Sequence, residues 1–88
     1  MEITFDPAKD QINQRKHGVS LALATRIDWP EVMSKPDTRH DYGEVREIGY
    51  AVIEQRLFCA VFTQRGDVMH VISLRKANSR EVKAYAEA

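Results

Sequence analysis

Residues 45–76 read VREIGYAVIEQRLFCAVFTQRGDVMHVISLRK, and this segment specifies most of a sheet. Alternating apolar and polar side chains, and short apolar runs, are typical of β-strands. The middle run is almost entirely apolar, which predicts a central strand. The turn at 64–67 contains Gly66 and predicts a hairpin. The strands are expected at Val45–Ile53, Leu57–Thr63 and Val68–Arg75.

The N-terminal residues predict a short strand followed by a helix. The strand is expected at Ile3–Phe5. Asp6 is a residue type that caps helices, and Pro7 suits the first helical position, where no backbone N–H is needed. The helix is expected to run to about Lys16 and to end at Gly18, because glycine readily adopts the left-handed conformation that closes a helix.

Three further elements complete the predicted fold. Ser20 suits the N-cap of a second helix, which Pro30 is expected to end. A short strand is expected at Glu31–Ser34. Asn78 and Glu81 have the spacing of a capping box, which predicts a short C-terminal helix. The order β-α-α-β-β-β-β-α predicts an α+β fold in which a small antiparallel sheet is covered by the helices on one face.

The composition predicts a single domain spanning residues 1–88. Apolar residues make up 43% and charged residues 30%, an ordinary globular mixture that argues against disorder. Cys59 is the only cysteine, which excludes an internal disulfide and a zinc site built from several cysteines. No apolar run approaches the roughly 20 residues that cross a bilayer, and no signal peptide is recognisable, so we expect a cytoplasmic protein.

The charge is balanced overall but not along the chain. Thirteen Lys and Arg residues are matched by thirteen Asp and Glu residues, which argues against broad, non-specific binding to nucleic acid. Residues 1–54 carry seven basic and ten acidic side chains, whereas residues 55–88 carry six basic and three acidic ones. The basic C-terminal part is therefore compatible with a small site that holds one phosphate.

No single motif in the sequence predicts a reaction, and only the histidines and basic residues taken together suggest one. No glycine-rich phosphate loop, GxSxG or HExxH motif is present. His17, His40 and His70 belong to different predicted elements, so a metal-dependent hydrolase stays an alternative that requires the fold to gather them. RNA can also be cleaved without a metal, because its 2′-OH is a built-in nucleophile. Such a site needs a base, an acid and cations beside the phosphate.

Motifs along most of the chain resemble those of the BrnT family of toxins. Each motif is loose by itself, but their order across essentially the whole chain is specific. They are FDPAK (5–9), Asn13, KHGVS (16–20), GExR (43–46), VFTxRG (61–66) and VISLRKA (71–77), followed by Glu81 and Tyr85.

This resemblance implies the toxin of a type II toxin–antitoxin pair. The implied fold is RelE-like, and the implied activity is a metal-independent endoribonuclease that inhibits translation and uses no cofactor. The implied partners are an RNA substrate and a BrnA-like antitoxin with a ribbon-helix-helix DNA-binding region, in a 2:2 hetero-oligomer. Operator DNA is contacted only through the antitoxin when the pair represses its own operon, and no membrane partner is expected.

The resemblance also selects the candidate catalytic residues. Arg65 and Arg75 are expected to contact the phosphate and stabilise the transition state. Lys16 or Lys76 is expected to add positive charge near the scissile phosphate, and His17 or Glu44 is the candidate base. The full set is Lys16, His17, Glu44, Arg46, Arg65, Arg75 and Lys76.

Alternatives to these assignments stay open. Each basic residue taken alone is more simply a solvated surface charge or a member of an ion pair. His70 stands where the family commonly has an arginine, and Leu74 stands where a small alanine is typical. The second functional hypothesis is therefore a catalytically weak or inactive homologue that acts mainly as an antitoxin-binding co-repressor of its operon.

Overall fold

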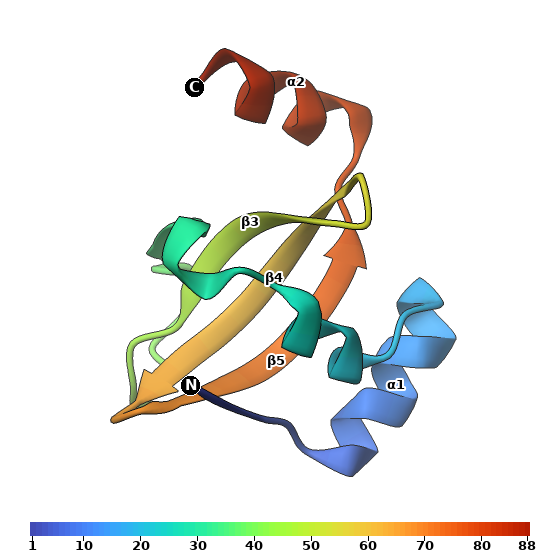
Figure 1. The fold of residues 1–88 in the computed structure, drawn as a ribbon. Coiled ribbons are helices and arrows are strands. Elements are labelled where there is room, and N and C mark those ends of the chain that lie inside the picture. Colours follow the sequence, from blue (N-terminus) through green and yellow to red (C-terminus); the bar gives the residue numbers. More distant parts are fainter.

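Five strands form one sheet in the order β1-β5-β4-β3-β2 (Figure 1). The computed structural model describes residues 1–88. The strands β3, β4 and β5 are consecutive antiparallel neighbours, and β4 is the middle strand, as its apolar sequence predicts. The bounds are β1 Glu2–Thr4, β2 Met33–Pro36, β3 Glu47–Ile53, β4 Arg56–Arg65 and β5 Val68–Lys76.

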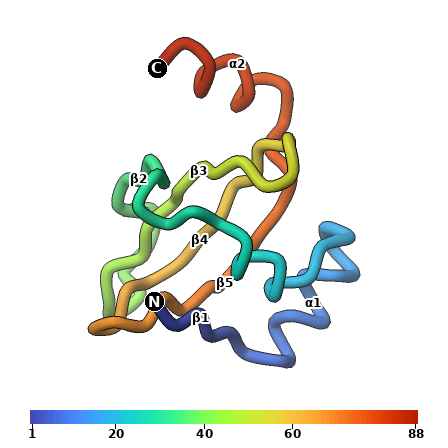
Figure 2. The backbone as a smooth tube through the Cα atoms, in the orientation of Figure 1, coloured from blue at the N-terminus to red at the C-terminus, as the bar shows by residue number.

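The sheet is mixed, which corrects the expectation of an antiparallel sheet. β1 pairs in parallel with β5, with Ile3 opposite Met69. Hairpin reasoning applies only to strands that follow one another, whereas β1 joins the sheet beside the strand that comes last in the sequence. Figure 2 shows the blue N-terminal segment alongside the orange segment of β5.

The first helix, α1 (Pro7–His17), forms where the sequence predicts it. The side chain of Asp6 accepts a hydrogen bond of 2.8 Å from the backbone N–H of Ala8. Gly18 has a φ of 70° and closes the last turn in the left-handed conformation. The helix is mostly polar, and its one buried residue is Asn13.

Asn13 fixes α1 against the edge of β5. Its side-chain amide donates to the carbonyls of Val19 and Leu74, both at 2.8 Å, and its side-chain oxygen accepts from the N–H of Leu74 at 3.2 Å. Because β1 pairs only with residues 68–70 of β5, no strand reaches Leu74 on this side. The amide takes the place of that strand and satisfies both backbone groups.

The predicted second helix is a pair of short 3₁₀ segments, η1 (Leu21–Arg26) and η2 (Trp29–Glu31). Ser20 caps η1 as expected, by accepting from the N–H of Ala22 at 3.1 Å. A segment of six residues is too short to stabilise an α-helix, and short pieces adopt the tighter 3₁₀ geometry. Pro30 lies inside η2 instead of ending an α-helix, because the first turn needs no N–H at that position.

The edge strand β2 begins two residues later than the expected strand Glu31–Ser34. Glu31 belongs to η2, so the strand begins only at Met33. Pro36 fits at the end of β2 because an edge strand tolerates a missing N–H. Every residue of β2 is exposed.

The hydrophobic core lies on one face of the sheet, which residues 19–32, including η1 and η2, cover. Leu21 and Ala24 of η1 are fully buried there. Trp29 of η2 packs edge-on against Phe62, with 5.0 Å between the ring centres. The strands contribute alternate side chains, as the period of two predicts. These are Ala51, Ile53, Phe58, Ala60, Phe62, Met69, Val71 and Leu74.

The C-terminal helix, α2 (Ser79–Glu87), lies over the opposite face, which corrects the expectation that the helices share one face. Tyr50 alternates with the core residue Ala51, and its hydroxyl donates to Glu81 of α2 at 2.9 Å. The predicted capping box between Asn78 and Glu81 is present. Figures 1 and 2 show α2 apart from α1, at the end where β5 leaves the sheet.

Candidate active site on the open face of the sheet

The face of the sheet opposite the core carries polar and basic side chains, and we call it the open face. It consists of the strand residues that alternate with the core residues. By register, α2 lies at one end of this face and the loop 37–46 lies at the other. From α2 towards the loop, it presents Tyr50, Cys59, Arg75, Thr63 and His70.

Four arginines lie on or beside the open face, and carboxylates hold three of them. Arg46 is the one without a carboxylate partner. Burial raises the pKa of the Cys59 thiol, and the charge of Arg75 lowers it. The ion pairs are Arg39–Asp37 at 2.7 Å, Arg75–Glu81 at 2.7 Å and Arg65–Glu44 at 2.8 Å.

Arg46 stacks on an aromatic ring instead of pairing with an acid. Its guanidinium carbon lies 4.0 Å from the centre of the Tyr42 ring. The Tyr42 hydroxyl donates to Asp37 at 3.2 Å, and the ring meets His40 edge-on with 5.7 Å between centres. The Nε atom of Arg46 is buried and has no hydrogen-bond partner. Arg46 therefore has no ion-pair partner and keeps an unused donor.

Glu44, Arg65 and His70 gather near the β4–β5 hairpin. Arg65 donates from Nε and Nη2 to the two oxygens of Glu44, at 3.2 and 2.8 Å. These hydrogen bonds hold the pKa of Glu44 below its usual range, and the charges of Arg46 and His70 act in the same direction. The hydroxyl of Thr4 lies 2.9 Å from Nδ1 of His70, which orients the ring and leaves Nε2 for another partner.

At the other end of the open face, Glu81 binds several donors at once. Arg75 donates from both terminal nitrogens to its two oxygens, at 2.7 and 2.8 Å. The Tyr50 hydroxyl and the N–H of Asn78 donate to the same carboxylate, each at 2.9 Å. The hydrogen bonds from Arg75 lower the pKa of Glu81 to about 2, and burial raises the pKa of Tyr50 to about 12. A residue of α2 thus neutralises Arg75.

The residues selected from the sequence fall into two groups. Arg75 stands opposite Cys59, which is six positions from Arg65 along β4, and this corresponds to about 20 Å at the rise of a β-strand. Because Glu44 holds Arg65 and Glu81 holds Arg75 at opposite ends of the face, one phosphate does not contact both guanidinium groups in this arrangement. The group near the loop 37–46 is Glu44, Arg46 and Arg65, and the group near the end of α1 is Lys16, His17, Arg75 and Lys76.

Only part of the second group faces the open side. Lys76 stands opposite the core residue Phe58 and shares a surface depression with η1. His17 ends α1, where desolvation and the nearby positive charges lower its pKa, so its ring is neutral at neutral pH. A neutral imidazole can accept a proton, whereas the lowered pKa of Glu44 weakens that carboxylate as a base.

The three histidines do not meet in the fold. His17 ends α1, His40 lies in the loop 37–46, and His70 is in β5. No group of three or more His, Cys, Asp or Glu side chains is arranged to hold a metal ion.

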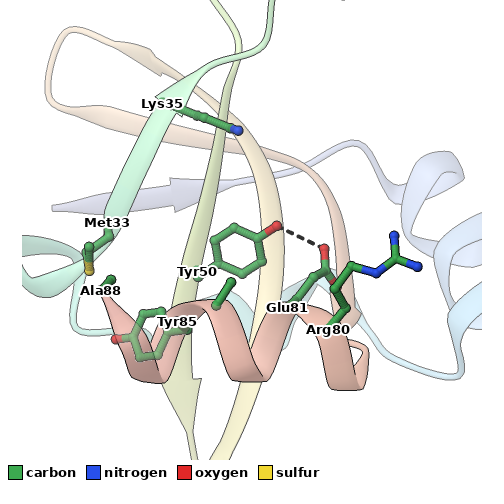
Figure 3. A pocket seen from close by; sticks show the side chains of 8 residues that line it. Met33, Lys35, Tyr50, Arg80, Glu81, Tyr85 and Ala88 are labelled. Atoms are coloured by element: carbon green, nitrogen blue, oxygen red, sulfur yellow. Dashed lines mark hydrogen bonds between the residues drawn. The ribbon is translucent and has the colours of Figure 1, made fainter.

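A groove of about 330 Å³ separates α2 from β2 and β3 (Figure 3). Figure 3 shows Tyr50 in this groove, with its hydroxyl bonded to Glu81. The lining is mostly apolar and includes the exposed edge residue Met33. It therefore suits an apolar side chain of a partner better than a phosphate. The lining residues are Met33, Lys35, Tyr50, Arg80, Glu81, Ala84, Tyr85 and Ala88.

Comparison with known families accounts for most of the chain. The sequence model of a family described as "Ribonuclease toxin, BrnT, of type II toxin-antitoxin system" matches residues 5–81. The chain belongs to the BrnT family. This confirms the resemblance carried by the motifs between FDPAK and Glu81. Membership in a family of type II ribonuclease toxins implies an RNA target and an antitoxin partner.

A solved BrnT structure has the same fold. The chain is similar to the Brucella abortus ribonuclease toxin BrnT, known from a crystal structure at 1.1 Å resolution. The TM-score is 0.71 at 23% sequence identity, and the match covers 90% of this chain and 99% of that chain. The similarity confirms the α+β architecture. No curated protein matches the chain, and none of its helices has the length and apolarity of a membrane span.

Several residues on or beside the open face of this BrnT chain are not selected by the sequence motifs. The sequence singles out His70 only as one of three scattered histidines and as a departure from the family pattern, and it does not single out Thr4, Tyr42 or Asp37. A signal for Tyr42 was available, because an aromatic residue between His40 and Arg46 in a polar loop is a typical arrangement for nucleic-acid contacts. No local signal predicts the contact between Thr4 and His70, which are 66 residues apart.

Proposed function

We propose that this BrnT family member is a metal-independent endoribonuclease that cleaves RNA in the cytoplasm and thereby inhibits translation. Its active site is the end of the open face beside the loop 37–46. One observation carries this assignment: Arg46, which forms no ion pair, directly follows Val45, whose carbonyl accepts from Thr63, and Thr63 stands opposite His70. A cation and a proton-transfer group at the same end of the face are what RNA cleavage without a metal requires.

The proposed reaction uses the 2′-OH of the RNA as the nucleophile. A base removes the 2′ proton while the 2′ oxygen attacks the adjacent phosphorus, and the bond between phosphorus and the 5′ oxygen breaks. An acid returns a proton to the 5′ oxygen, so the products are a 2′,3′-cyclic phosphate and a 5′-hydroxyl end. Arg46 and Arg65 stabilise the charge that develops on the phosphate oxygens.

His70 is the preferred proton-transfer group in this proposal. Thr4 orients its ring through Nδ1, and an imidazole can both accept and donate a proton. Glu44 is the alternative base and keeps Arg65 in position. A second candidate centre consists of Lys16, His17, Arg75 and Lys76, and its Arg75 lies about 20 Å from Arg65 along the sheet.

The proposal is tested with a single-stranded oligoribonucleotide and the purified chain. We expect cleavage in the presence of EDTA and no cleavage of the all-deoxy oligonucleotide, which lacks the nucleophile. Arg46→Gln should lower the cleavage rate by about 100-fold, as loss of a transition-state donor does. Arg56→Gln, a matched change at an exposed arginine without an ion pair, should keep the wild-type rate. Wild-type activity of folded Arg46→Gln would refute this site.

Two histidine variants distinguish the candidate centres. His70→Ala should abolish cleavage while His17→Ala retains it, if the centre lies beside the loop 37–46. The reverse result would move the active site to the end of α1. Circular dichroism of both variants shows whether they keep the wild-type fold.

The partner in this proposal is a BrnA-like ribbon-helix-helix antitoxin in a 2:2 hetero-oligomer, and this partner alone contacts operator DNA. The exposed edge strand β2 and the adjoining apolar groove support a docking position for it. An antitoxin segment can add a strand to β2 and insert a side chain into the groove. Amide exchange of residues 33–35 should slow on complex formation, and unchanged exchange there would contradict this docking position.

A second candidate function is a weak or inactive homologue that acts as an antitoxin-binding co-repressor. The observation that favours it is that carboxylates hold three of the four arginines of the open face. RNA must displace these carboxylates before those arginines can act. Induction of the chain alone distinguishes the two functions: growth arrest with RNA degradation supports the ribonuclease, and unimpaired growth with tight antitoxin binding supports the co-repressor.

A further inference from the structure

The loop between β2 and β3 contains a stack of side chains that phosphate chemistry alone does not require. His40, Tyr42 and Arg46 follow one another in contact, with 5.7 Å between the first two ring centres and 4.0 Å from the Tyr42 centre to the guanidinium. None of the three is in the hydrophobic core, and His40 is exposed. Aromatic rings beside cationic groups are the surfaces on which proteins stack the bases of single-stranded RNA.

Asp37 holds this stack in place before any ligand binds. Its carboxylate is buried and accepts from Nε and Nη2 of Arg39 at 2.8 and 2.7 Å, as well as from the Tyr42 hydroxyl. Its backbone N–H donates to the carbonyl of Arg46 at 2.7 Å, which closes the loop. A surface ordered in advance binds its ligand with a smaller loss of conformational entropy.

Arg46 provides a second, independent indication of a ligand. Its Nε atom is buried without an acceptor, and such a donor is costly to leave unsatisfied. Because this atom is shielded from solvent, a phosphate or base oxygen can supply the missing acceptor only when the Arg46 side chain shifts. The same side chain contacts Tyr42 and acts on Glu44, so it links the stack to the proposed catalytic group.

We propose that the loop 37–46 is a nucleobase subsite, in which Tyr42, flanked by His40 and Arg46, stacks on an unpaired base next to the phosphate held by Arg46. This inference rests on the proposed ribonuclease function and identifies the substrate class as single-stranded RNA. Bases of a duplex are already stacked on their neighbours and are not available to this surface. The subsite therefore directs cleavage to unpaired regions.

Binding is measured with a single-stranded 2′-O-methyl oligonucleotide, which cannot be cleaved, carrying 2-aminopurine at successive positions. Stacking on Tyr42 should quench the fluorescence at one position. Tyr42→Leu should weaken binding by about 5- to 100-fold, the usual loss of one base–aromatic stack, and should remove the quenching. Tyr42→Phe keeps the ring and should retain both properties. Tyr85→Leu, at a half-exposed tyrosine of α2, is the matched control and should bind as the wild type does.

The outcomes separate this subsite from the proposed function. Unchanged binding by Tyr42→Leu, or an equal loss in Tyr42→Phe, overturns the subsite even if unmodified RNA is cleaved. A wild-type chain that binds and quenches the probe but never cleaves unmodified RNA contradicts the ribonuclease and leaves the subsite standing. A wild-type chain that does not bind the probe overturns the subsite, and cleavage of unmodified RNA then decides the function separately.

Discussion

A single buried amide, that of Asn13, makes the hydrogen bonds to Leu74 that another strand would make at the edge of β5. The same amide also binds the carbonyl of Val19, just beyond the end of α1. One side chain thus ties together α1, the connection to η1 and the sheet. Both the nitrogen and the oxygen of the amide are hydrogen-bonded, so no other residue type can replace it without leaving a buried group unsatisfied.

Asn13→Asp tests this role with a change of almost no volume. A carboxylate cannot donate, so the carbonyls of Val19 and Leu74 both lose their partner and a charge is buried beside them. We expect the free energy of unfolding to fall by about 3 kcal/mol, measured by urea denaturation. Gln11→Glu on the exposed side of α1 should change it by less than about 0.5 kcal/mol. Equal urea midpoints for Asn13→Asp and wild type would contradict the proposed role.

At the scale of elements, α2 depends on ionic hydrogen bonds more than on burial. None of its residues is buried, and its link to the sheet consists largely of the contacts of Glu81 with Arg75 and Tyr50. The η1 segment depends instead on apolar packing, since Leu21 and Ala24 are buried in the core. We therefore expect α2 to detach under conditions in which the rest of the fold persists.

Acidification should release α2. The pKa of Glu81 lies at about 2 in the folded chain, below the ordinary 4.5, so its pairing stabilises the fold above pH 4.5 and is lost as the pH falls towards 2. Amide signals of residues 79–87, followed by NMR, should report this transition. Glu81→Gln should abolish the pH dependence of this transition. At neutral pH it should lower the free energy of detaching α2 from the sheet by about 1–3 kcal/mol. The control variant Glu87→Gln, at the exposed end of the helix, should show the same pH dependence of these amide signals as the wild type.

At the scale of the whole molecule, zero net charge limits the range of electrostatic attraction to RNA. The arginines of the open face act locally, and carboxylates neutralise three of them. Few phosphates are therefore bound at once. The molecule is suited to a short segment of RNA and not to coating long strands.

Salt dependence measures the number of phosphates bound. With two or three phosphates neutralised, the logarithm of the binding constant for a 2′-O-methyl single strand should fall with the logarithm of salt concentration with a slope of about −1 to −2. A basic protein that coats RNA has a much steeper slope. A measured value steeper than about −4 would show that a larger basic surface takes part.

Local sequence was sufficient for much of the fold. The caps at Asp6 and Gly18, the Asn78 capping box and the alternation of side chains in β3–β5 all depend on residues close in the chain. The BrnT family was also evident from the order of short motifs. The sequence predicts an α-helix at η1, because the Ser20 cap is evident from the sequence and the 3₁₀ geometry is not.

Tertiary structure alone decided how these parts meet, because contacts between distant residues leave no local pattern. It set β1 parallel to β5, put α2 on the open face, and separated Arg65 from Arg75 by about 20 Å. It also placed carboxylates beside three arginines, whereas Arg46 stacks on the ring of Tyr42. The sequence supplied the residue types of a phosphate site, and only the packing of strands and loop selected which of them can act on one phosphate.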